Sequence, residues 1–255
     1  MPASPRTRSG VTAEPRQKTP RAVTTAVKAS EKPAPRGRAP FSEQAYQDLR
    51  ARILDNRMPS GEQFTEEQLA ALLEMSRTPV REAMLRLEKE GLVEVRPRHG
   101  MRIRPLSVND VREIYEVLTG LESTAAALAA QREDQGDYVQ QMRSAIKDMD
   151  KALKRDDRRS WAAADERFHT ALVEAAGNAR ISELVQTFFD QSHRVRMLTL
   201  FLRPMPINSN RDHEAVAEAV ASHDAKRARE LHHGHRERSG KMLVDLLIRH
   251  GLTRI

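Results

Sequence analysis

From Ser107 to the end of the chain, apolar residues recur at helical spacing and no run alternates apolar with polar side chains. Ser107 to Asp110 forms a capping box that opens the first helix. One face of this helix carries the apolar residues Ile114, Val117, Leu118, Leu121 and Ala125. Further helices are expected near residues 136–155, 159–176, 180–202, 211–222 and 224–250, separated by short polar or proline breaks. About six helices without a strand predict an all-α bundle over residues 107–255.

The segment before this bundle, residues 41–106, has a different pattern. One helix is expected from Ser42 and ends at the turn Met58-Pro59-Ser60-Gly61. Thr65 to Gln68 forms a capping box that opens a second helix. A third is expected to start with Thr78 as its cap and Pro79 in its first position, and to stop at Gly91. Two short strands, residues 92–95 and 101–104, follow. Three helices and a hairpin predict a winged helix-turn-helix.

Charge within this segment is uneven. Residues 41–76 hold three basic and seven acidic side chains, whereas residues 77–106 hold eight basic and four acidic ones. Arg77 and Arg81 fall at the N-terminal end of the third helix, where a recognition helix meets base edges. His99 and Gly100 fall at the tip of the hairpin, where a small turn can enter a minor groove. The pattern favours double-stranded DNA as a partner.

Residues 1–40 carry the whole net charge of the chain, which is +7, because they hold nine basic and two acidic side chains. They also contain seven of the thirteen prolines and few large apolar residues. Such a composition predicts a disordered basic tail. Two interpretations stay open for it: a solvated leader, or an arm that tethers DNA without sequence preference.

Composition excludes several classes of function. There is no cysteine, so disulfides, thiolate metal sites and a cysteine nucleophile are ruled out. No window approaches the ~18 apolar residues of a membrane helix, and the first residues lack the apolar core of a secretory signal. We therefore expect a soluble cytoplasmic protein that associates with the nucleoid and not with a membrane.

Eight of the nine histidines lie in the helical region. Asp165 and His169 are four residues apart and share a helix face, while His213 and His235 each fall on an apolar face of a later helix. One carboxylate and three imidazoles suit a divalent ion such as Zn²⁺ or Ni²⁺. The other interpretation is that each histidine is an ordinary core residue with a hydrogen-bond partner.

The motifs resemble those of a known family. The N-terminal segment is similar to the DNA-binding domain of GntR-family bacterial transcription regulators in Pro59-Ser60-Gly61, in the run from Ser76 to Ala83, in the run from Leu87 to Val93, and in His99-Gly100. The helical region resembles the effector (FCD) domain of the FadR-type branch in Asp165-Glu166-Arg167-Phe168-His169, Ala176-Gly177-Asn178, Asp212-His213 and His235.

The resemblance implies specific roles. Base or phosphate contacts would come from Arg77, Thr78, Arg81, His99 and Gly100. The metal ligands would be Asp165, His169, His213 and His235, and a small carboxylate effector would complete the coordination shell. Many relatives carry an arginine in the first effector-domain helix where this chain has Leu118, so Arg196, in preference to Arg194, is the candidate effector-binding cation. The family also implies a homodimer.

These observations lead to one expected function and two alternatives. We expect a ligand-responsive transcription regulator, a repressor released from a pseudo-palindromic operator by its effector, and not an enzyme. The first alternative is a metal-dependent enzyme that uses the Asp/His₃ set to activate water. The second is a DNA-architectural protein that binds without sequence preference through its tail.

Overall fold

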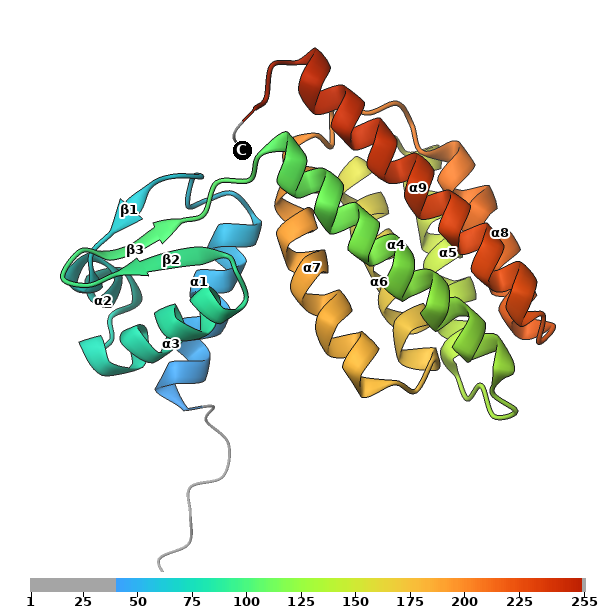
Figure 1. Cartoon of the computed structure of the whole chain (residues 1–255), viewed down its shortest axis with the longest axis horizontal. Coiled ribbons are helices and arrows are strands. Elements are labelled where there is room, and N and C mark those ends of the chain that lie inside the picture. Colours follow the sequence, from blue (N-terminus) through green and yellow to red (C-terminus); the bar gives the residue numbers. More distant parts are fainter. Residues whose placement is uncertain (1–39, 254–255) are drawn as a thin grey trace, which may run out of the picture. The chain divides into compact units, whose positions relative to one another are not determined.

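The computed structural model describes residues 40–253, so the basic tail predicted for residues 1–40 falls, apart from Pro40, outside the described residues. Within residues 40–253 the chain forms nine helices and three short strands (Figure 1). All three strands belong to the N-terminal part of this range. The predicted fold class is therefore confirmed: a winged helix-turn-helix is followed by an all-α bundle.

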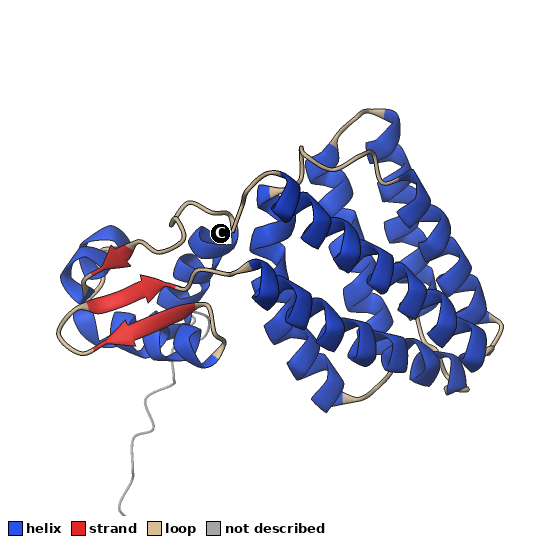
Figure 2. Cartoon of the chain, turned by 45° about the horizontal axis from the view of Figure 1, so that its top comes forward, coloured by secondary structure: helices blue, strands red, loops and turns tan. Residues whose placement is uncertain are grey.

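The N-terminal part combines three helices with a small antiparallel sheet (Figure 2). In chain order its elements are α1 (Phe41–Leu54), β1 (Gln63–Phe64), α2 (Glu66–Leu73), α3 (Arg77–Lys89), β2 (Val93–Arg96) and β3 (Gly100–Ile103). The sheet order is β1-β3-β2. Strands β2 and β3 match the two predicted strands to within one residue. Strand β1 is additional, because two residues are too few to produce an alternating pattern.

The helices of this part close over a shared apolar core. Its fully buried side chains come from every helix and from β3 and include Leu49, Ile53, Leu69, Met84, Leu87 and Met101. The inward face of α3 carries Val80 and Ala83, which are also buried. Its opposite face is consequently left exposed to solvent.

Local capping explains where these helices begin and end. Thr65 accepts a hydrogen bond from the backbone N–H of Gln68, whose side chain accepts one from the N–H of Thr65, so the predicted capping box is confirmed. Gly91, with φ at +73°, follows the C-cap of α3, also as predicted.

The predicted start of α3 is wrong by two residues. Ser76 is the N-cap and has extended backbone angles, so Thr78 and Pro79 lie inside the first turn. Every N–H of the first turn lacks an intrahelical acceptor, so proline is tolerated there and does not mark the first position alone.

The second part contains six helices over residues 108–249. They are α4 (Val108–Gln131), α5 (Tyr138–Lys154), α6 (Arg158–Ala175), α7 (Ala179–Leu198), α8 (Ile207–Ala221) and α9 (Ala225–Arg249). The capping box predicted at Ser107 and Asp110 is present at the start of α4. Helix α7 ends four residues before its predicted end at 202. Pro204 and Pro206 lie in the segment that connects it to α8.

Alanine-rich faces let these helices pack closely. Helix α4 runs along α9, and α5 runs along α6. One core cluster joins α4, α5, α6, α8 and the start of α9 around Met142, Met149 and Phe168. A second joins α4, α7 and the end of α9 around Leu118 and Leu243. Among residues 40–253, no helix combines the length and the apolar character required to cross a membrane.

Candidate metal centre and nucleic-acid interface

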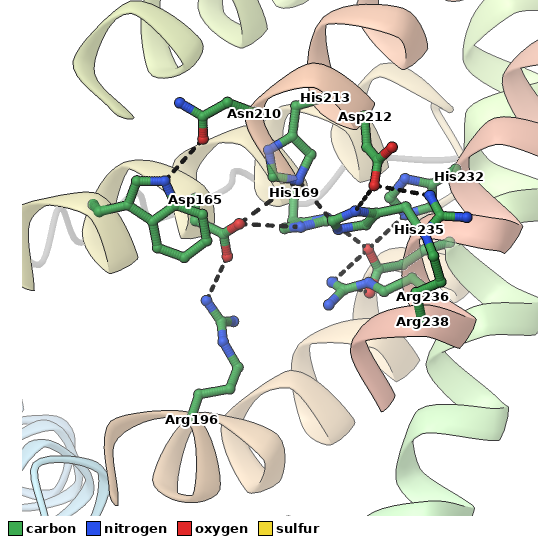
Figure 3. A network of polar contacts seen from close by, with 12 residues as sticks. Asp165, His169, Arg196, Asn210, Asp212, His213, His232, His235, Arg236 and Arg238 are labelled. Atoms are coloured by element: carbon green, nitrogen blue, oxygen red, sulfur yellow. Dashed lines mark hydrogen bonds and ion pairs between the residues drawn. The ribbon is translucent and has the colours of Figure 1, made fainter. Parts of the chain in front are cut away.

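Four side chains from three helices meet inside the bundle (Figure 3). Asp165 and His169 stand one turn apart on α6, while His213 comes from α8 and His235 from α9. Each is at most 5 % exposed. Asp157 caps α6 and Asp224 caps α9 by accepting backbone N–H bonds, which fixes where these helices start. The structure therefore brings together the four residues predicted as metal ligands.

The separations between these groups suit a small divalent ion. Nε2 of His213 lies 3.2 Å from Nε2 of His235. Oδ1 of Asp165 lies 3.7 Å from Nε2 of His169 and 3.6 Å from Nε2 of His213. Ligands of a tetrahedral zinc ion, each about 2.0–2.2 Å from the metal, lie about 3.4 Å from one another. The three measured separations are close to that value.

A buried nitrogen without a hydrogen-bond partner also fits a metal ion in this position. Nε2 of His169 is buried and has no hydrogen-bond partner among the described residues. A buried polar atom left without a partner normally costs free energy, which a metal ion in this position would relieve. Burial holds the pKa values of His169 and His213 well below the ordinary histidine value. Both imidazoles are thus neutral at pH 7, the form that binds metals.

A second acidic group lies directly behind this cluster. Glu122 of α4 is fully buried, and its carboxylate accepts two hydrogen bonds from Nη2 of Arg236, at 2.5 and 2.7 Å. Its Oε2 also lies 3.0 Å from Nδ1 of His169 and 3.1 Å from Nε2 of His232. Although burial opposes ionisation, the charge of Arg236 holds the pKa of Glu122 well below its usual range. Glu122 is thus anionic and lies beside Nδ1 of His169.

Sequence reasoning missed Glu122, His232 and Arg236. His232 and Arg236 could have been noticed because they flank His235 on one face of α9. Glu122 leaves a weaker signal, a single carboxylate on the apolar face of α4 one turn after Leu118. Asp212 is a comparable case, with its Oδ2 3.2 Å from Nδ1 of His235. Carboxylates behind metal-binding histidines fix the orientation of the ring.

The cluster opens into a cavity of about 270 Å³. Trp161, Met205 and Met242 supply apolar wall, and five arginines also line it, at positions 158, 196, 203, 236 and 238. Arg196, the predicted effector-binding residue, reaches the cavity, where its Nη2 donates to Oδ2 of Asp165 at 2.6 Å. Arg194 does not line the cavity and instead donates to the backbone carbonyl of Arg104.

The predicted DNA contacts lie at the exposed start of α3. The side chains of Arg77 and Arg81 are 61 % and 70 % exposed, and Thr78 between them is exposed as well. Arg77 forms ion pairs with Glu66 at 3.0 Å and Glu67 at 2.8 Å, both on α2. Exposed ion pairs of this kind are weak. Exchange of these carboxylates for phosphate or base groups therefore requires little free energy.

The two predicted wing residues have different surroundings. His99 is exposed in the turn between β2 and β3. Gly100 is buried with φ at +81°, and a Cβ atom there would lie 2.0 Å from the carbonyl oxygen of Phe64. Gly100 therefore allows the close approach of β3 to β1. Because it is buried, it offers no exposed surface for the DNA contact predicted for it.

Comparison with known proteins locates two families in the chain. Residues 41–103 match the model of bacterial regulatory proteins, gntR family, and residues 113–238 match the FCD domain. The first match covers the three helices and the sheet described above. The second covers all of the candidate metal ligands.

Individual relatives agree with these matches. An HTH-type transcriptional regulator from the TAR-I ttuE-ttuC′ intergenic region of Agrobacterium vitis is 46 % identical over 134 residues, 52 % of this chain and 78 % of the relative. The HTH-type transcriptional repressor RspR of Escherichia coli is 24 % identical over 185 residues, 72 % of this chain and 81 % of the relative. The solved structure of E. coli McbR/YncC superposes with a TM-score of 0.68 at 18 % identity, over 82 % of this chain and 99 % of that one, which is a likeness of fold.

Proposed function

Because the chain belongs to the gntR family of bacterial regulatory proteins and carries an FCD domain, we propose that it represses transcription and is released from its operator by a small carboxylate. Family membership makes it a ligand-responsive DNA-binding regulator and not an enzyme. The proposed steps are operator recognition by the winged helix-turn-helix and effector binding in the cavity of the bundle. In a bacterium such a regulator acts in the cytoplasm, where the chromosome lies.

The observation that carries this proposal is a buried cluster of metal-ligand type opening into a cavity of metabolite size. Asp165, His169, His213 and His235 would hold the ion, with Zn²⁺ or Ni²⁺ suited to three imidazoles and one carboxylate. The ion would supply a Lewis-acid centre for a carboxylate oxygen, which requires coordination beyond the four protein ligands. Nη2 of Arg196 donates to Asp165 and so orients it. Nη1 of Arg196 has no hydrogen-bond partner among the described residues and is free to donate to the carboxylate of the effector.

Operator recognition is proposed for the exposed start of α3. Arg77 and Arg81 would meet base edges in the major groove, and Thr78 a phosphate. His99 at the wing tip would enter the adjacent minor groove. We propose a homodimer whose two wings occupy the halves of a pseudo-palindrome. Effector binding would favour a dimer geometry that no longer fits successive grooves, which requires different affinities for the two states.

The test of DNA recognition is selection of source-genome fragments on the purified protein at physiological salt. The variant Arg77→Ala/Arg81→Ala should lose the enriched sequence, while Arg180→Ala, which removes an even more exposed arginine on α7, should keep it. Uniform, salt-sensitive retention by all three proteins would favour the architectural alternative and contradict the proposal.

Metal binding has its own test. Metal content after purification and dialysis should fall in His213→Ala and His235→Ala, because each removes one ligand. His250→Ala serves as the matched control, since His250 is exposed after the end of α9. Full metal content in both ligand variants would reject the site without affecting the evidence for DNA binding.

A further inference from the structure

The arginines that line the cavity differ in one respect. Four of them have a carboxylate partner, in the pairs Arg158–Asp156, Arg196–Asp165, Arg236–Glu122 and Arg238–Asp212. Arg203 has no carboxylate within 4.0 Å among residues 40–253. It is therefore the cavity arginine whose positive charge is not compensated by an ion pair in the described part of the chain.

The surroundings of Arg203 make this lack of a partner significant. Nη2 donates to the backbone carbonyl of Arg196 at 2.6 Å, whereas Nε is buried without a hydrogen-bond partner. Burial, reinforced by the charge of Arg196, lowers the pKa of Arg203 to about 10, so the group stays cationic at neutral pH. Arg203 as a residue is half-buried. A charge in such a place without an ion-pair partner is unfavourable, and an anion bound in the cavity would supply the opposite charge.

The segment that carries Arg203 is held in place before any ligand arrives. Nη1 of Arg158 donates to the carbonyls of Leu200 and Arg203, at 3.2 and 2.5 Å. Pro204 and Pro206 restrict the backbone just beyond. A cation fixed in this way loses little conformational entropy when it binds an anion.

We propose that the effector is a small dicarboxylate whose second carboxylate binds Arg203. This inference rests on the proposed function, in which the first carboxylate occupies the metal cluster beside Arg196. A monocarboxylate placed there would leave Arg203 unpaired. The apolar side chains of Trp161, Met205 and Met242 also line the cavity and suit a short carbon chain between the two anionic groups.

The charge of the cavity favours carboxylate over phosphate as the second group. Arg203 contributes one uncompensated positive charge, which matches one carboxylate. A phosphate monoester brings about −1.5 to −2 at pH 7, which exceeds the single positive charge of Arg203. The planar guanidinium also matches the carboxylate fork with two parallel hydrogen bonds.

The test compares acids of equal chain length by isothermal titration calorimetry on the full-length, zinc-loaded protein. Succinate is paired with butyrate, and glutarate with valerate. In each pair we expect the dicarboxylate to bind about tenfold tighter or more, as a hydrogen-bonded charge pair provides. Arg203→Gln should reduce the preference to less than about threefold. Arg238→Gln, a cavity arginine already paired with Asp212, should retain it.

A second measurement separates ligand binding from a purely structural role. Without ligand, Arg203→Gln should unfold at the same or a higher temperature than the wild type, because it removes a half-buried charge that has no ion-pair partner. A marked loss of stability would mean that Arg203 is needed to hold the fold. Arg203→Lys, which keeps the charge but loses the fork, should retain part of the preference.

The possible outcomes distinguish this inference from the proposed function. Equal affinity for matched mono- and dicarboxylates, tighter binding of a phosphorylated acid, or no binding of either class would overturn the inference. Operator release by a monocarboxylate would overturn it while supporting the regulator. Preferential dicarboxylate binding that leaves operator affinity unchanged would support the inference and contradict effector control of DNA binding.

Discussion

Replacing Glu122 by glutamine removes one negative charge from the most buried ion pair of the bundle. Glu122 is 0 % exposed and Arg236 is 2 % exposed. Glutamine has nearly the same shape and keeps one oxygen as an acceptor for Arg236, so packing is little altered. The perturbation therefore tests the charge itself. It also leaves Nδ1 of His169 and Nε2 of His232 facing a neutral amide.

The magnitude follows from the geometry of the pair. Removing one partner of a buried ion pair costs about 3–5 kcal/mol, because the remaining charge stays in a medium of low dielectric constant. The retained acceptor places Glu122→Gln at the lower end, about 3 kcal/mol. That is a large part of the ~5–15 kcal/mol by which a typical domain is stable. Loss of the carboxylate behind His169 should also weaken zinc binding about tenfold or more.

Equilibrium urea unfolding of chelator-treated protein measures the first effect, and zinc competition with a chromogenic chelator measures the second. Glu218→Gln is the matched control, since Glu218 forms an exposed pair with Arg143 and should change stability by less than about 1 kcal/mol. In the Arg236→Gln background, Glu122→Gln should be far less harmful, because no cation is left unpaired. Equal stability of Glu122→Gln and Glu218→Gln would refute the assignment of Glu122 as the charge partner of Arg236.

Three further predictions concern the wing, pH and the N-terminal tail. Gly100→Ala should destabilise the winged helix by about 1–3 kcal/mol in thermal unfolding, because a Cβ there meets the Phe64 carbonyl at 2.0 Å; an unchanged midpoint would contradict this. Burial lowers the pKa of His232 to about 4 from 6.5, so this side chain alone should cost metal-free protein about 3 kcal/mol of stability as pH falls from 6.5 to 4; His232→Gln should remove that share of the pH dependence, and an unchanged dependence would contradict this. Deleting residues 1–40 should reduce the salt slope of DNA binding more than its sequence preference; an unaltered slope would remove the tail from DNA binding.

The parts of the fold that could be predicted from sequence are those decided within a few residues. The capping boxes at Thr65 and Ser107 and the stop at Gly91 depend on neighbours three or four positions away, and the structure confirms all three. The start of α3 was misplaced because Ser76 and Thr78 are both capping residues and only the backbone angles decide between them. Strand β1 exists through its pairing with β3, about forty residues later, and has no local signature.

The residues of the candidate site were likewise only partly predictable from the sequence. Asp165, His169, His213 and His235 were found because each falls on an apolar helix face, where a polar group needs an explanation. Glu122 and His232 were not, since their contact joins residues 110 positions apart and depends on how α4 and α9 pack. Arg203 lies outside any helix, where periodicity says nothing about burial. What sequence patterns lack is the pairing between elements, and that pairing decides which buried charges are compensated.

The family resemblance implies a cavity arginine on the first helix of the effector domain, which is α4, and this chain lacks it. In this chain the position in α4 is taken by Leu118, which is fully buried in the core. The guanidinium groups reach the cavity from α7 and α9 instead, through Arg196 and Arg236, and Arg236 is already neutralised by Glu122. A carboxylate bound at the metal cluster would thus be tied to α6, α7, α8 and α9 and only indirectly to α4. Because a ligand can shift an equilibrium only through elements it contacts differently in two states, the helices that respond to the effector should be α6, α7, α8 and α9.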